Sequence, residues 1–225
     1  MAALTGACIN ESLNPGFNKN FVKAATFSIG LLRATPIDFG ISSKQGTISL
    51  YEIATNKFGL ITNYQMIPYN DPGFACGSYI NFEGFGRLIL RPSDIEVIST
   101  SEELDATVIE LSESCVALLK ERGAKFLNIA TARVGEEVTI VKSPFAFFSV
   151  VKGTILSFRK TTLLYSSKEG SGSNGSPILY GDLQAIGLIR HNNSEPLHTF
   201  EEHCSATLLS EIVAMHSKTR ESLPS

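Results

Sequence analysis

Short runs that alternate apolar and polar residues follow one another along most of the chain, from about residue 24 onwards. Gly, Asn, Pro and Asp separate these runs, and that combination is typical of β-strands joined by tight turns. The first group of predicted strands is Ala24–Ala34, Gly46–Ile53, Phe58–Thr62, Tyr79–Phe82, Arg87–Leu90, Glu96–Ile98 and Thr107–Leu111. The second group is Val138–Lys142, Val150–Phe158, Leu163–Tyr165, Pro177–Leu179, Ala185–Ile189 and His203–Ala206. Two groups of short strands predict two β-barrels or sandwiches.

Two stretches have helical rather than strand spacing. Between the strand groups, Ser114 is predicted to cap a short helix that ends at Gly123. The second stretch lies near the end of the chain, and its apolar face consists of Leu208, Leu209, Ile212, Val213 and His216. We expect this second helix to pack on the second barrel and to fray into the polar residues 217–225.

The length of 225 residues fits one large domain or two small, tightly joined ones. Hydrophobic residues make up 43% and charged residues 18%, so the chain has enough apolar material for a packed core. The predicted organisation is an N-terminal segment over 1–23, a first β-barrel over 24–111, a linker with a short helix over 112–128, a second β-barrel over 129–207, and a C-terminal helix and tail over 208–225.

Charge and apolar runs limit the expected partners and location. The net charge is −3 and the sequence has no long basic stripe, which argues against nucleic acid as a partner. The longest mostly apolar run, 144–151, is far shorter than the ~20 residues that span a bilayer, and the first residues do not resemble a secretory signal. We therefore expect an intracellular, cytoplasmic protein that uses neither a membrane nor nucleic acid as its partner.

The four cysteines are Cys8, Cys76, Cys115 and Cys204, and they form no C-x-x-C pair. Their wide separation argues against a metal site, and without a secretory signal we expect free thiols in a reducing compartment. We expect no cofactor. No recognisable base motif lies beside Cys76 or Cys115, so each is interpreted as a structural thiol.

Three segments carry a more specific signal. They are FGLITNYQMI over 58–67, LDATVIEL over 104–111, and GSGSNGSPIL over 170–179 followed by QAIGLI over 184–189. In this order they resemble the catalytic segments of the trypsin-like serine proteases, in particular the cysteine-poor intracellular branch. The resemblance covers about residues 24–218. It implies an all-β, chymotrypsin-like double six-stranded β-barrel with a C-terminal helix.

The resemblance also assigns the three catalytic positions. Asp105 matches the family's aspartate, Gln65 stands at the histidine position, and Asn174 stands at the serine position. A serine protease needs an imidazole to move a proton and a hydroxyl to attack the scissile carbonyl. Neither a glutamine nor an asparagine amide does this near neutral pH. The chain is therefore interpreted as a pseudoprotease that is not an enzyme and binds a protein or peptide partner.

The resemblance implies which residues would bind that partner. The oxyanion-hole amides would come from Gly172 and Asn174. The peptide-binding strand would end in Ile189, Arg190 and His191, and would pair with an extended peptide. Relatives that prefer acidic residues have a histidine where Ile189 stands here, which does not favour an acid-selective pocket. Arg190 and His191 either meet an acidic partner or form a solvated strand end.

Two further choices stay open at this level. Gln65 and Asn174 either form a neutral hydrogen-bonded copy of the triad with Asp105, or they drifted after selection for catalysis ended. The alternatives to a binding module are an active serine endopeptidase with a non-standard nucleophile, for which Ser173 is the candidate, and a structural domain of a larger assembly.

Overall fold

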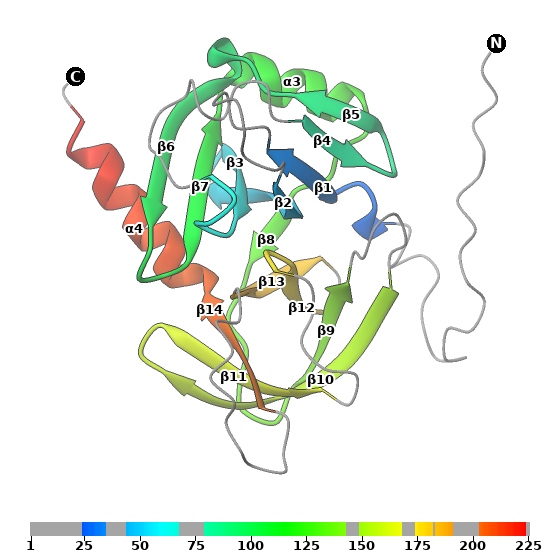
Figure 1. Ribbon diagram of the computed structural model, residues 1–225, viewed down its shortest axis with the longest axis vertical. Helices are drawn as coiled ribbons and strands as arrows, with labels where there is room; N and C mark the ends of the chain where they lie inside the picture. Colours follow the sequence, from blue (N-terminus) through cyan, green and yellow to red (C-terminus); the bar gives the residue numbers. More distant parts are fainter. Residues whose placement is uncertain are drawn as a thin grey trace.

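The computed structural model describes residues 24–34, 44–67, 79–142, 149–167, 174–181, 183–190 and 203–223. Two groups of strands lie one above the other, with a helix running along one side (Figure 1). The upper group, the first barrel, contains β1 (Ile29–Ala34), β2 (Lys44–Ala54), β3 (Lys57–Thr62), β4 (Tyr79–Phe82), β5 (Gly86–Ile89), β6 (Ile95–Ser101) and β7 (Ala106–Leu111). Their order is β5-β4-β1-β2-β3-β7-β6, with antiparallel pairs throughout. A single 3-10 turn, η1 (Pro92–Asp94), precedes β6.

The lower group, the second barrel, is a closed ring of six antiparallel strands. It contains β9 (Glu137–Lys142), β10 (Ser149–Arg159), β11 (Thr162–Ser167), β12 (Pro177–Tyr180), β13 (Gln184–Ile189) and β14 (His203–Leu208). The ring order is β12-β9-β10-β11-β14-β13, and β13 pairs with β12 to close it. The short strand β8 (Leu127–Ile129) pairs in parallel with β2 on one side and with β13 on the other, so it joins both barrels into one sheet.

The buried apolar side chains form three clusters. One fills the first barrel around Leu60 and Ile109, and one fills the second barrel around Ile140 and Leu163. The third lies between the barrels and the C-terminal helix. Strand β7 is buried at all six of its positions, because one face looks into the first barrel and the other is covered from outside. This double coverage explains why four of its six residues are apolar and why Thr107 and Glu110 are buried as well.

Two helices flank the barrels. Helix α3 (Glu113–Glu121) begins after Ser112, whose Oγ accepts a hydrogen bond from the Cys115 amide at 3.3 Å. The N-cap is therefore Ser112, and the prediction of Ser114 was wrong by two residues. The predicted end at Gly123 is confirmed, since this glycine follows the C-cap with a φ of 86°. Neither this helix nor the other one in the described ranges is long and apolar enough to cross a membrane.

Helix α4 (Leu209–Glu221) confirms the predicted C-terminal helix but differs from it in two respects. It begins beside β13 and β14 and then runs across β6 and β7, so it packs on the first barrel as well as the second (Figure 1). It also continues to Glu221, where fraying from residue 217 was expected. The helix stays ordered to this point because Arg220 Nη1, in its last turn, lies 3.0 Å from Glu110 Oε1 of the first barrel and forms an ion pair with it.

The predicted fold class, an all-β double barrel of the chymotrypsin type with a C-terminal helix, is confirmed, and each predicted strand overlaps an observed one. The predicted start at Ala24 was wrong, because residues 24–25 are helical and residues 26–28 form a turn, in which the Ser28 amide donates to the Ala25 carbonyl at 3.0 Å. Strand β8 was missed, since three residues are too few to show a strand period.

Candidate functional site

The site suggested by the sequence lies where the two barrels meet, and Asn63 is at its centre. This residue follows β3 and is 1% exposed. Its Nδ2 donates to Asp105 Oδ2 at 3.0 Å, to the Asp105 carbonyl at 3.2 Å and to the Ile189 carbonyl at 3.0 Å. Three acceptors around one amide group fix which end of the side chain is nitrogen. Asn63 therefore connects the first barrel's carboxylate to the second barrel's strand β13.

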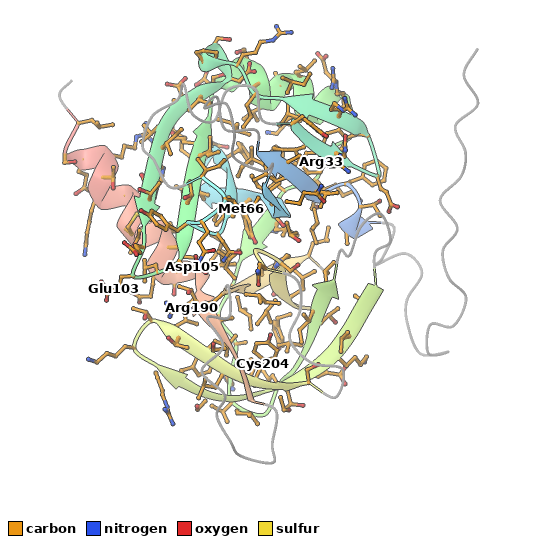
Figure 2. All side chains as sticks on the ribbon, viewed as in Figure 1. Arg33, Met66, Glu103, Asp105, Arg190 and Cys204 are labelled. Carbon is orange, nitrogen blue, oxygen red and sulfur yellow. The ribbon has the colours of Figure 1, made fainter. Side chains whose placement is uncertain are left out.

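Asp105 lies on the turn between β6 and β7, and this turn is held at three successive carbonyl groups. Arg190 Nη2 donates to the Glu103 carbonyl at 2.9 Å, and Thr207 Oγ1 donates to the Leu104 carbonyl at 2.8 Å. Asn63 donates to the third carbonyl, that of Asp105. Figure 2 shows Glu103, Asp105 and Arg190 close together at the junction of the barrels. Two of the three donors come from the second barrel, so the turn is positioned by both halves of the molecule.

The backbone of Asp105 is in the left-handed region, with a φ of 47°. A non-glycine residue pays a conformational cost there, although aspartate tolerates this region better than most. The residue is 8% exposed, and its own amide donates to the Glu102 carbonyl at 3.1 Å. The three carbonyl contacts and this turn bond together keep a strained residue in place.

Asn174 lies opposite, on the loop before β12, and is half-buried. The Thr47 amide of β2 donates to the Asn174 carbonyl at 3.1 Å. The next residue, Gly175, has a φ of 76° and donates its amide to the Ile189 carbonyl at 3.0 Å. A Cβ at Gly175 would lie 2.4 Å from the Thr47 carbonyl oxygen and 3.1 Å from Asn63 Oδ1. Glycine is therefore required at this point for the loop to reach the first barrel.

Gln65 lies two residues after Asn63, in a turn closed by the Met66 amide donating to the Asn63 carbonyl at 3.0 Å. Its side chain is exposed, whereas Met66 and Asn63 beside it are buried. The structure thus brings the three predicted positions to one junction. Asn63, two residues before Gln65, donates to Asp105 and to the Ile189 carbonyl. Gly175, the residue after Asn174, donates to the same Ile189 carbonyl. Three further residues with predicted roles lie outside the described residues: Gly172, Ser173 and His191.

The second-barrel strand predicted to bind peptides ends at this junction. The Ile189 amide donates to the Ser176 carbonyl at 2.9 Å, while its carbonyl accepts from both Gly175 and Asn63. Both backbone groups of Ile189 are therefore used within the chain. Arg190, the next residue, is half-buried and uses one guanidinium nitrogen on the Glu103 carbonyl.

The other nucleophilic side chains considered in the described part, Ser176, Cys115 and Cys204, are buried. Ser176 is fully buried and donates to Thr47 Oγ1 at 3.2 Å. The thiols of Cys115 and Cys204 are buried, and Cys8 and Cys76 lie outside the described residues. Burial raises the pKa of the Cys115 thiol to about 11, Asp94 adds to this, and Arg122 opposes it. Within the described ranges, no group of three or more His, Cys, Asp or Glu side chains is arranged to hold a metal ion.

Comparison with solved structures identifies the architecture. The Rv3671c protease in its inactive form superposes with a TM-score of 0.56, covering 88% of this chain and 93% of that chain. This chain has a trypsin-like protease fold. The two sequences are only 14% identical, so the likeness concerns the protease fold alone. No protein-family model matches the sequence, and no curated protein sequence matches it.

Sequence reasoning missed the residue that organises the site. Asn63 stands in the motif ITNYQ immediately after a buried strand, and a polar residue at the end of such a strand was the available signal. Its three acceptors come from segments 42 and 126 positions away, so no local pattern could identify them. The contacts of Arg190 and Thr207 with the β6–β7 turn were missed for the same reason.

Proposed function

We propose that this chain is a catalytically inactive homologue of the trypsin-like serine proteases that works as a protein- or peptide-binding module. The observation that carries the proposal is the residue set at the three catalytic positions. Asp105 is retained, but Gln65 and Asn174 bring amides where proteolysis needs an imidazole and a hydroxyl. In such a triad, loss of the serine or the histidine alone lowers the rate about a millionfold, and loss of both costs little more.

Asn63 gives this proposal a structural basis. In a working relay the aspartate holds the imidazole in the correct tautomer. Here Asp105 Oδ2 accepts from the Asn63 amide at 3.0 Å, and the same amide also binds the Ile189 carbonyl. The buried carboxylate of Asp105 thus has a hydrogen-bond donor that also connects the two barrels, and this role needs no proton transfer.

The retained geometry supports a binding role over simple decay. Asp105 keeps a left-handed backbone, Gly175 keeps a φ that requires glycine, and the β6–β7 turn is fixed at three carbonyls. A rigid frame of this kind lowers the entropic cost of ordering a bound segment. Because both backbone groups of Ile189 are used within the chain, an extended peptide would have to pair with backbone groups other than those of Ile189.

The first test restores catalysis. We expect the wild type to cleave nothing in a proteome-derived peptide library and to resist labelling by a fluorophosphonate probe. The double variant Gln65→His/Asn174→Ser should be labelled and should cleave, and adding Asp105→Asn should abolish most of that activity. Cleavage by the wild type would overturn the assignment as an inactive homologue.

The second test measures binding directly. The residues around the cut sites of the revertant define a peptide, and wild-type affinity for it is measured by titration calorimetry. Gln65→Trp places a large ring at the exposed junction and should weaken binding at least about tenfold. Thr55→Trp, at an equally exposed turn on the far end of β3, is the matched control and should bind normally. Equal affinities for both variants would show that the junction is not the binding site and would favour a structural domain.

A further inference from the structure

A second polar cluster lies outside the junction, under helix α4. In Figure 1 this helix crosses the outer side of β6 and β7. Alternation along β7 turns Ala106, Val108 and Glu110 outward, toward the helix. Glu110 is 1% exposed, His216 of α4 is 4% exposed, and Ser99 of β6 has no exposed surface. A carboxylate, an imidazole and a hydroxyl are thus buried together between a helix and a sheet.

The three side chains form a chain of hydrogen bonds. Ser99 Oγ lies 2.8 Å from His216 Nδ1, and His216 Nε2 lies 3.1 Å from Glu110 Oε2. Because an ionised carboxylate only accepts, Nε2 carries the proton that it donates to Glu110. In a neutral imidazole Nδ1 is then an acceptor, and the Ser99 hydroxyl donates to it. Every polar atom of a neutral His216 ring is therefore satisfied.

Two cations complete the cluster on the other carboxylate oxygen. Arg220 Nη1 lies 3.0 Å and Lys57 Nζ lies 3.4 Å from Glu110 Oε1. This oxygen receives no aligned hydrogen bond, so both cations act mainly through their charge. Lys57 comes from β3 and Arg220 from α4 itself, so Glu110 of β7 is paired with cations from a neighbouring strand and from the helix.

These residue types are those of a hydrolytic relay, but the site cannot be one. A nucleophile must reach a substrate carbonyl, and Ser99 has no exposed surface. The bonds instead connect α4 to β6 and β7, so their effect is on where the helix lies.

The cluster accommodates a neutral imidazole better than a charged one. Protonated His216 would donate at both nitrogens, so Ser99 would have to turn and would lose its own acceptor. The added charge would also join a group in which Lys57 and Arg220 already outnumber Glu110. Of the other strands against α4, β13 has no titratable residue, and β14 has the buried Cys204 and His203, whose side chain lies outside the described part.

We propose that Ser99, His216 and Glu110 form an acid-released latch that holds the C-terminal half of α4 on the first barrel. The N-terminal half of the helix is held differently, because Leu209 and Ile212 are fully buried in the cluster between the barrels. Acid therefore frees the segment from about Val213 to Glu221 and leaves the barrels intact. The latch is independent of the function proposed for the junction.

The sign of the pH effect follows from the histidine. Burial lowers the pKa of His216 from its ordinary 6.5, Glu110 opposes this through its hydrogen bond and charge, and Arg220 adds to it. When the helix is detached, His216 has its ordinary pKa of 6.5. Between pH 6.5 and the lowered pKa, the detached state therefore binds more protons than the attached state. Attachment is strongest above pH 6.5 and weakens as the pH falls from 6.5 toward the lowered pKa.

Hydrogen exchange on the full chain tests the latch. After correction for intrinsic rates, amides of residues 213–221 should lose protection by up to about tenfold per pH unit between pH 6.5 and the lowered pKa, the limit for uptake of one proton. Amides of α3 should keep theirs. In His216→Gln, whose amide can still donate to Glu110 and accept from Ser99, the pH dependence of α4 should disappear. Glu211→Gln, an exposed change on the same helix, is the matched control and should behave as the wild type.

Two results would overturn the proposal: protection of α4 that does not change with pH, or an unchanged pH dependence in His216→Gln, which would assign it to another group. The wild type alone provides a second readout if the variant does not fold. The His216 ring signals, followed by NMR, should titrate below 6.5 and together with the loss of α4 protection. A midpoint at or above 6.5 would contradict the latch.

Discussion

The molecule contains two polar clusters with opposite relations to protease chemistry. At the junction of the barrels, the positions predicted to be catalytic hold the carboxylate of Asp105 and the side-chain amides of Gln65 and Asn174. Under α4 the residue types are right, with Ser99, His216 and Glu110 in hydrogen-bond contact, but the serine is completely buried. A hydroxyl, an imidazole and a carboxylate can act on a substrate only where the substrate can reach them, so residue types alone do not identify a catalytic site.

The clusters also differ in what their carboxylates do. Glu110 gathers an imidazole and two cations and fixes a helix onto a sheet. Asp105 accepts from the amide of Asn63, whose other acceptor is on the second barrel. One carboxylate therefore has two charged partners, and the other accepts a hydrogen bond from an uncharged amide that also reaches the second barrel. Substitutions in each cluster separate these two roles.

The largest effect is expected for Glu110→Ala. Removing one partner of a buried ion pair typically costs about 3–5 kcal/mol, because the other partners stay uncompensated. Lys57 and Arg220 are 38% and 46% exposed and can turn to water, so we expect the lower end, about 3 kcal/mol. Urea unfolding measures the loss, with Glu102→Ala on the exposed β6–β7 turn as the control. A loss below about 1 kcal/mol would mean that the cluster does not hold α4 in place.

A smaller effect is expected for Asn63→Ala. The substitution removes the amide that Asp105 Oδ2 and the Ile189 carbonyl share, while Gly175 still donates to that carbonyl. A hydrogen bond to a charged group contributes about 1.5–3 kcal/mol. We expect about 2 kcal/mol by the same unfolding experiment. Asn128→Ala removes an exposed amide at the barrel linker and should change stability by less than about 0.5 kcal/mol. If the two variants are equally stable, Asn63 does not join the barrels.

The smallest effect is expected for Gln65→Ala. The side chain is exposed, and substitutions at exposed positions usually change stability by no more than about 0.5 kcal/mol. The result decides between the two interpretations of Gln65 and Asn174, a hydrogen-bonded network with Asp105 or drift. A loss of about 1 kcal/mol or more would support a neutral network in which Gln65 helps to hold Asp105. No loss would favour drift, with Asn63 satisfying the carboxylate.

The sequence predicts the barrels well because each strand has a local pattern that can be recognised without knowing its partners. Alternation of apolar and polar residues and the turn residues between them located every strand long enough to show a period. Strand β8 has three residues, and residues 24–28 are as apolar as the strand that they precede, so both escaped the pattern. The N-cap was misplaced because Ser112 and Ser114 both precede the same apolar turn, and the local sequence does not distinguish them.

The polar clusters are less predictable because their partners are distant in the sequence. The motifs located Gln65, Asp105 and Asn174, yet the donor that connects the halves, Asn63, depends on how two barrels meet. The signals for the second cluster were present but isolated: Glu110 is a charged residue inside a buried strand, and His216 stands on the apolar face of a helix. Each suggests a buried partner, and only the packing of α4 on β6 and β7 shows that they are partners of each other.

Strand β8 has a consequence for how the molecule comes apart. Its three residues bond in parallel to β2 and to β13, so the backbone hydrogen-bond network passes from one barrel to the other without interruption. A swinging motion of one half against the other would break main-chain bonds as well as side-chain contacts, and either half expressed alone would lose a strand neighbour. The two barrels should consequently melt in a single cooperative transition, and the halves should need each other to fold.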